Sequence, residues 1–222
     1  MSDYKLISAD SHVSEPPGLW VEGVDRRYRD RAPRLVVNPP GLEGAYFLYE
    51  GYAPHPIGIG LAAGKSPEEL AEFLTKGTYA DARPGGWDPA ERLKDNEQDG
   101  VEADVLYTTL GFRIFWLKDA GLQQECFRAY NDWLAAYCRY APERMAGLAM
   151  ISLYEPKAGA AELERCVKAR SQGRDDLVLA SRRPALQLGG LRPVLGPRPG
   201  ASHADQPALD HRHGLGKPVE LR

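Results

Sequence analysis

Two apolar segments in the first 168 residues have the pattern of buried strands. The run over residues 4–9 is mostly apolar, and so is the run from Met145 to Leu153. Short continuous apolar runs are typical of strands covered on both faces, as in parallel sheets. We therefore predict buried strands over residues 4–9 and 145–153.

Helical spacing of apolar residues is clearest between Leu122 and Tyr140, and Pro142 ends this predicted helix. The apolar stripe consists of Leu122, Cys126, Phe127, Tyr130, Trp133, Leu134, Tyr137 and Cys138. A further helix is predicted from Pro156 to Lys168, with Leu163, Cys166 and Val167 facing inward.

Local start and stop signals predict two more helices. Ser66-Pro67-Glu68-Glu69 is a capping box with proline at the first helical position, so a helix begins at Pro67. Asp88-Pro89-Ala90-Glu91 repeats that signal, and Asp99-Gly100 ends the second helix. Ala103–Tyr107 then has the pattern of a strand.

Residues 18–62 are rich in Pro, Gly and Tyr, which indicates a long excursion with a small hairpin near residues 45–49. Outside this excursion, predicted strands and helices alternate along the chain. That alternation predicts an α/β fold with a parallel sheet.

An acid and an imidazole stand close together at the end of the first predicted strand. Asp10 and His12 are two residues apart, and Pro16-Pro17 then stop regular structure. Because residues i and i+2 of a strand point to one face, both side chains are directed at a single point. They are candidate ligands for half of a metal site; alternatively, they cap or hydrogen-bond the local backbone.

Composition excludes several classes of protein. The net charge of −3 implies neither a nucleic-acid nor a membrane partner. No long apolar run or N-terminal signal is present, so we expect a soluble, cytoplasmic protein. Cys126, Cys138 and Cys166 lack a C-x-x-C pairing, and we expect buried free thiols.

The composition changes near residue 169. All aromatic residues (4 Trp, 11 Tyr and 5 Phe) lie at or before Tyr154, whereas residues 169–222 contain none and are rich in Arg, Pro and Gly. We divide the chain into a partial barrel, residues 1–168, and a tail, residues 169–222. The tail is either a natural disordered segment or a segment translated out of frame.

The first part resembles the amidohydrolase-related (amidohydrolase 2) family of metal-dependent hydrolases. This family also holds decarboxylases such as aminocarboxymuconate-semialdehyde decarboxylase and the resorcylate-type enzymes. The resemblance rests on four stretches in order, namely Ile7–Pro16, Arg92–Tyr107, Tyr130–Leu134 and Ala141–Ala149.

The resemblance implies a distorted (β/α)8 TIM-like barrel, of which this chain holds an incomplete N-terminal portion, with the active site at the carboxyl ends of the strands. It implies that Asp10 and His12 are metal ligands, although the acid departs from the His-x-His form. The family completes its site with a later His and Asp. The implied cofactor is a divalent metal, Zn or Mn, and the harder carboxylate favours Mn²⁺.

The tail yields family-like stretches when it is read one nucleotide later with suitable synonymous codons. Residues 170–178, 186–195 and 202–215 then regain aromatic residues and a strand-like pattern. We therefore hypothesise a frameshift near Lys168–Arg170, which removes the remaining ligands. If the tail is natural instead, His203, His211 and His213 are the remaining candidates, although His211-Arg212-His213 has the wrong position in the chain for the family's His-x-His.

Other polar residues each have a functional and a structural interpretation. Glu15 reaches the site or is solvated, His55 lines a pocket or lies on a surface loop, and Arg113 binds a substrate carboxylate or faces solvent or a structural acid. Asp95, Asp99 and Asp104 are expected to be structural, and Trp133 and Tyr137 to belong to the core.

The expected function is metal-dependent hydrolysis or non-oxidative decarboxylation of a small carboxylic or cyclic molecule, impaired in this chain. The scaffold does not separate the two reactions. The alternative is a non-catalytic fragment or pseudo-enzyme that self-associates through an unpaired sheet edge, as a homo-oligomer.

Overall fold

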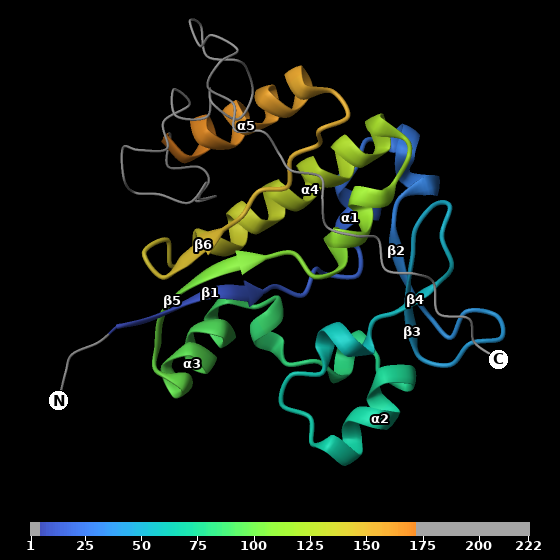
Figure 1. The fold of residues 1–222 in the computed structure, drawn as a ribbon, viewed down its shortest axis with the longest axis vertical. Coiled ribbons are helices and arrows are strands. Elements are labelled where there is room, and N and C mark those ends of the chain that lie inside the picture. The colour runs from blue at the N-terminus through green and yellow to red at the C-terminus, as the bar shows by residue number, and fades with distance from the viewer. Residues whose placement is uncertain (1–4, 172–222) are drawn as a thin grey trace, which may run out of the picture. The chain divides into compact units, whose positions relative to one another are not determined.

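A parallel sheet and its connecting helices form the centre of the computed structural model, which describes residues 5–171. The sheet has the order β1-β5-β6, with all neighbours parallel (Figure 1). These strands are β1 (Leu6–His12), β5 (Val101–Tyr107) and β6 (Met145–Gly147). Figure 1 shows α3 below the strands and α4 above them. The predicted α/β class with a parallel sheet is confirmed.

Helices and short turns connect the strands. The α-helices are α1 (Leu19–Gly23), α2 (Pro67–Lys76), α3 (Pro89–Asp99), α4 (Ala120–Cys138) and α5 (Pro156–Ser171). The 3-10 helices are η1 (Arg26–Arg31), η2 (Gly58–Leu61), η3 (Tyr79–Asp81), η4 (Pro84–Gly86) and η5 (Leu110–Trp116).

The helix boundaries follow the local signals. Ser66 forms the predicted capping box at the start of α2, and the Asp88 side chain accepts from the first backbone N–H groups of α3. Gly100 ends α3 in the left-handed region, at φ 70°. Helix α4 begins before the predicted Leu122, because the Asp119 side chain accepts the Leu122 N–H and caps the helix there.

The segment rich in Pro, Gly and Tyr, residues 18–62, contains a second sheet, which is antiparallel and has the order β2-β3-β4. Its strands are β2 (Arg34–Val37), β3 (Ala45–Leu48) and β4 (His55–Pro56), which confirms the predicted hairpin. Figure 1 places this sheet beyond the carboxyl ends of β1 and β5. There the Tyr52 hydroxyl donates to the Trp116 carbonyl of η5 at 2.9 Å.

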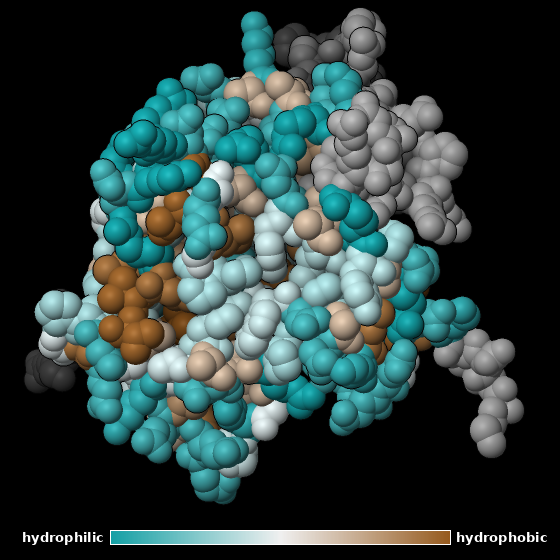
Figure 2. Space-filling view, turned by 180° about the vertical axis from the view of Figure 1, so that it is seen from behind, coloured by the Kyte–Doolittle hydropathy of each residue, from teal (hydrophilic) through white to brown (hydrophobic). Residues whose placement is uncertain are grey.

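The prediction that the first strand is buried on both faces was wrong. Leu6 and Ile7 are 56% and 59% exposed, because β1 pairs only with β5 and forms an edge of the sheet among the described residues. The rear view in Figure 2 likewise shows apolar side chains in patches on a mostly hydrophilic surface.

A bulge interrupts the pairing of β1. Ser8 pairs with Asp104 and Ser11 with Leu106, so three steps along β1 match two along β5. The Ser8 and Ser11 hydroxyls consequently lie 2.7 Å apart, on the same side of the strand. A bulge of this kind locally redirects side chains at the strand end.

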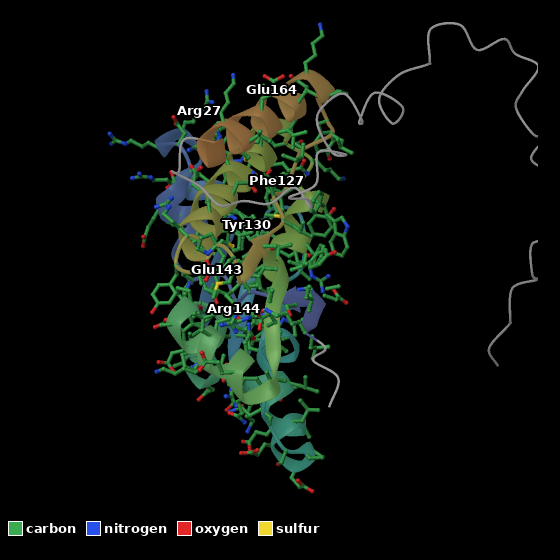
Figure 3. The ribbon with its side chains drawn as sticks, turned by 90° about the vertical axis from the view of Figure 1, so that its left-hand side faces the viewer. Arg27, Phe127, Tyr130, Glu143, Arg144 and Glu164 are labelled. Carbon is green, nitrogen blue, oxygen red and sulfur yellow. The ribbon has the colours of Figure 1, made fainter. Side chains whose placement is uncertain are left out.

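The core forms around α4, as the apolar stripe predicted. Every stripe residue except the half-buried Trp133 is buried. Figure 3 shows Phe127 and Tyr130 of α4 inside the molecule, whereas Glu164 of α5 lies at its outside. Cys166 also packs into this core, but Val167 is 39% exposed, contrary to the prediction.

The last strand is shorter than the predicted 145–153, because β6 pairs only with β5, over Asp104–Leu106. Farther along, the side chain of Asn131 donates to the Met150 carbonyl at 3.0 Å and accepts from its N–H at 2.8 Å. This α4 amide therefore takes the place of a neighbouring strand.

Candidate metal centre at the end of the first strand

The carboxyl ends of β1 and β5 bring His12 to the backbone of Thr108. The His12 Nδ1 atom lies 2.7 Å from the Thr108 carbonyl oxygen, which can only accept, so the ring proton is on Nδ1. Nε2 lies 3.7 Å from Asp10 Oδ1, and in this neutral tautomer its lone pair is available to a metal. A backbone carbonyl that fixes the tautomer in this way is typical of metal-binding histidines.

The geometry of Asp10 and His12 fits two ligands of one ion. Two atoms bound about 2.1 Å from a tetrahedral metal lie about 3.4 Å apart, close to the observed 3.7 Å. Both side chains are accessible, with exposures of 87% for Asp10 and 42% for His12. In the part of the chain described, no third His, Cys, Asp or Glu joins them, whereas catalytic metal sites use at least three protein ligands. The pair is therefore part of a site.

The buried ion pair of Arg92 and Asp104 holds the carboxyl end of β1 in place. Arg92 of α3 donates to the His12 carbonyl at 2.8 Å and to Asp104 at 3.0 Å. Ser11 and Asn96 also donate to Asp104. Burial opposes ionisation of Asp104, but these donors outweigh it and hold its pKa below the ordinary value. Asp104 is thus structural, as predicted.

Glu15 is fully buried, so the expectation that it is solvated was wrong. Its carboxylate accepts the Thr108 hydroxyl and the backbone N–H groups of Thr109, Leu110 and Gly111, each N–H at 3.0 Å. The carboxylate therefore joins the loop after β1 to the start of η5. No local sequence signal predicts this, because its partners lie more than 90 positions away.

His55 and Arg113, which sequence analysis treated as separate candidates, contact each other. Arg113 Nη2 lies 3.0 Å from His55 Nε2, and the guanidinium lies 5.0 Å from the centroid of the Trp116 ring. Arginine can only donate, so the imidazole accepts and is neutral. Burial first, and then the Arg113 charge, lower the pKa of His55. The structural acid considered for Arg113 is not found among residues 5–171.

The remaining candidates have structural surroundings. Asp95 pairs with Arg83, and Asp99 is an exposed residue at the end of α3. The rings of Trp133 and Tyr137 lie 5.7 Å apart within the core region. The three cysteines are buried free thiols, as predicted, and burial raises the pKa of Cys126 to about 12. His203, His211 and His213 lie outside the described residues.

A cavity of about 590 Å³ lies beside β1, between the strand, α3 and the turns that precede α3. Ser8, Ser11 and Asp104 line it from the strands, and Arg92 and Asn96 line it from α3. His12 is also among its lining residues, but Asp10 is not. The residues that support the strand end therefore form part of the cavity wall, whereas the acid of the candidate metal pair does not.

Comparison of the fold with solved structures identifies the kind of architecture to which the described residues belong. The chain is similar to an amidohydrolase from Mycobacterium avium subsp. paratuberculosis, with a TM-score of 0.55 and 16% sequence identity over 77% of this chain and 48% of that chain. The described residues have the fold of the N-terminal portion of a (β/α)8 barrel. The chain spans about half the length of that amidohydrolase, 48%.

A weaker likeness links the chain to a 2,6-dihydroxybenzoate decarboxylase from Rhizobium. The TM-score is 0.39, with 17% identity over 74% of this chain and 35% of that chain, which is too low to carry an argument. No family model matches the sequence. None of the described helices is long and apolar enough to cross a membrane.

Proposed function

We propose that Asp10 and His12 are the first two ligands of a divalent metal in a hydrolase or non-oxidative decarboxylase of the amidohydrolase type. The observation that carries the proposal is the His12 tautomer. Its Nδ1 proton is held by Thr108, and its Nε2 lone pair lies beside the Asp10 carboxylate. The family resemblance and the barrel fold support this position for a metal, because such barrels bind at the carboxyl ends of their strands.

The residues of this chain would hold and orient the ion. Asp10 supplies a charged oxygen and His12 a neutral nitrogen, a donor pair that suits Zn²⁺ or, with its hard carboxylate, Mn²⁺. Arg92 and Thr108 keep His12 in place through the two bonds described above. When bound, the metal would activate water or polarise a small carboxylic or cyclic substrate.

Metal content tests the proposal. Because the described residues supply only two ligands, we would measure binding directly, by titrating the purified 222-residue chain with Zn²⁺ or Mn²⁺ in equilibrium dialysis. We expect weak metal binding that is lost in Asp10→Asn and His12→Asn but kept in Asp99→Asn, which changes another exposed aspartate. Equal metal in all four proteins would refute the assignment.

A second candidate function is a non-catalytic, self-associating fragment. It is favoured by the exposed edge strand β1, where Leu6 and Ile7 are more than half exposed. Unpaired edges with apolar side chains favour association with another chain. Light scattering tests this: a homo-oligomer without bound metal would support the fragment, and a monomer that retains metal would contradict it.

We further propose a relation to the aminocarboxymuconate-semialdehyde decarboxylase branch and a change of reading frame near Lys168–Arg170. The loss of aromatic residues after Tyr154 supports the frame hypothesis. Sequencing of the DNA through codons 160–230 tests it. A frame that stays open one nucleotide out of register would support it, and early stop codons in that frame would refute it.

A further inference from the structure

Among residues 5–171, the charge of Arg113 is oriented but no carboxylate neutralises it. Its contacts in the described part of the chain are the neutral His55 imidazole, at 3.0 Å, and the Trp116 ring. Other partly or largely buried arginines have acceptors of a different kind. Arg92 and Arg165 bind carboxylates, and Arg144 donates to backbone carbonyls. Arg144 lies beside the start of β5 (Figure 3). Arg113 therefore keeps a full positive charge in a fixed position.

Both partners of Arg113 preserve that charge. The His55 lone pair accepts one N–H without adding negative charge, and the Trp116 face restricts the guanidinium plane. A guanidinium has five N–H donors in a planar fork, so donors remain for a second partner. A planar donor fork of this kind matches a carboxylate.

Arg113 also belongs to the same end of the sheet as the candidate metal pair. It lies on η5, directly after Phe112, whose ring centroid is 5.9 Å from that of His12. His55 comes from β4, in the antiparallel sheet beyond the strand ends. Phe112 and Trp116 are 47% and 49% exposed, so apolar surface adjoins the guanidinium.

We propose that Arg113, oriented by His55 and Trp116, is a binding site for the carboxylate of a small substrate with an apolar body. This proposal rests on the proposed function, because it assigns the recognition of a substrate to the same end of the barrel. A single guanidinium suits a monoanionic carboxylate better than a phosphate dianion.

Tryptophan fluorescence would report binding, because Trp116 contacts Arg113, and Trp116→Phe would identify its share of the signal. The full chain, treated with a chelator, would be titrated with benzoate and with benzamide, its uncharged analogue. We expect benzoate to bind about tenfold or more tightly than benzamide. Charged hydrogen bonds predict a loss of about ten- to a hundredfold in Arg113→Gln.

Two comparisons separate a binding role from a purely structural one. Arg27→Gln is the matched control, since Arg27 also lies over a ring, at 4.8 Å from Tyr28, but has its own partner in Asp25. It should bind benzoate as the unaltered protein does. His55→Gln keeps an acceptor for Arg113 and should retain binding, whereas His55→Phe should weaken it severalfold.

Several outcomes would overturn the proposal. Equal binding of benzoate and benzamide would do so, and so would equal losses in Arg113→Gln and Arg27→Gln. Tighter binding of inorganic phosphate than of benzoate would refute the carboxylate assignment. If Arg113→Gln does not fold, the His55→Gln and His55→Phe pair still decides, because equal affinities would refute the role of the imidazole.

The chelator separates this inference from the proposed function. Benzoate selectivity in metal-free protein that never retains metal would support the carboxylate site and contradict the metal site. Retained metal without benzoate selectivity would overturn the carboxylate site alone.

Discussion

Replacing Glu15 by Gln is the sharpest test of how the site is supported. Glu15 is 0% exposed, and its carboxylate accepts four hydrogen bonds from residues that open η5. Oε1 accepts three of them, and Oε2 accepts the Leu110 N–H. The glutamine amide keeps one acceptor oxygen, but its NH2 group replaces Oε2. The NH2 group and the Leu110 N–H are then two donors that face each other without an acceptor.

The magnitude follows from these four bonds. Each bond to Oε1 loses the benefit of the charge, about 1 kcal/mol, and an unsatisfied buried donor costs about 1–3 kcal/mol. The easier burial of a neutral amide offsets part of this loss. We expect Glu15→Gln to lower the free energy of unfolding by about 3 kcal/mol.

Urea denaturation, followed by fluorescence, measures this difference. Glu97→Gln is the matched control, because Glu97 is exposed on α3 and the same exchange there should change stability by less than about 0.5 kcal/mol. The reasoning is refuted if Glu15→Gln unfolds within about 0.5 kcal/mol of the unaltered protein.

Three further predictions concern stability. Because the pKa of Asp104 is lowered in the folded protein, its carboxylate stabilises the fold above the pKa of an unfolded aspartate, and this stabilisation is lost as pH falls through the folded pKa. Asp104→Asn should therefore reduce the acid-side fall of the urea midpoint with pH. An unchanged pH dependence in this variant would contradict the assignment. Ser66→Ala removes the capping box of α2 and should cost about 1 kcal/mol in urea unfolding, whereas Ser66→Asp should cost little. Gly100→Ala forces a side chain into φ 70° and should cost about 1–2 kcal/mol, so an unchanged melting temperature would contradict the left-handed end of α3.

The elements that sequence analysis placed well have short-range causes. The capping box at Ser66, the N-cap at Asp88 and the end of α3 at Gly100 each depend on residues within a few positions. Neighbouring residues in the sequence are therefore enough to predict them. The buried apolar stripe of α4 was also predicted correctly, because helical spacing of apolar residues alone identifies the buried face of a helix. The pair of Asp10 and His12 followed from strand alternation, which brought its two side chains within 3.7 Å.

Sheet neighbours account for the errors in the strands. An apolar run indicates burial only when strands or helices cover it, and β1 has a single strand partner among the described residues. The predicted strand over 145–153 ended early for a related reason, since Asn131 replaced a strand as the partner of Met150. Neither fact is encoded in the local pattern.

The sequence by itself thus determined the α/β rhythm, the helix ends and the first two candidate ligands, because each depends on neighbours along the chain. Only the tertiary structure decided that Glu15 is buried, that Arg92 supports His12, and that Arg113 meets His55 across 58 positions. The physical reason is that a hydrogen bond needs two groups within about 3 Å, and for distant residues the path of the whole chain sets that distance.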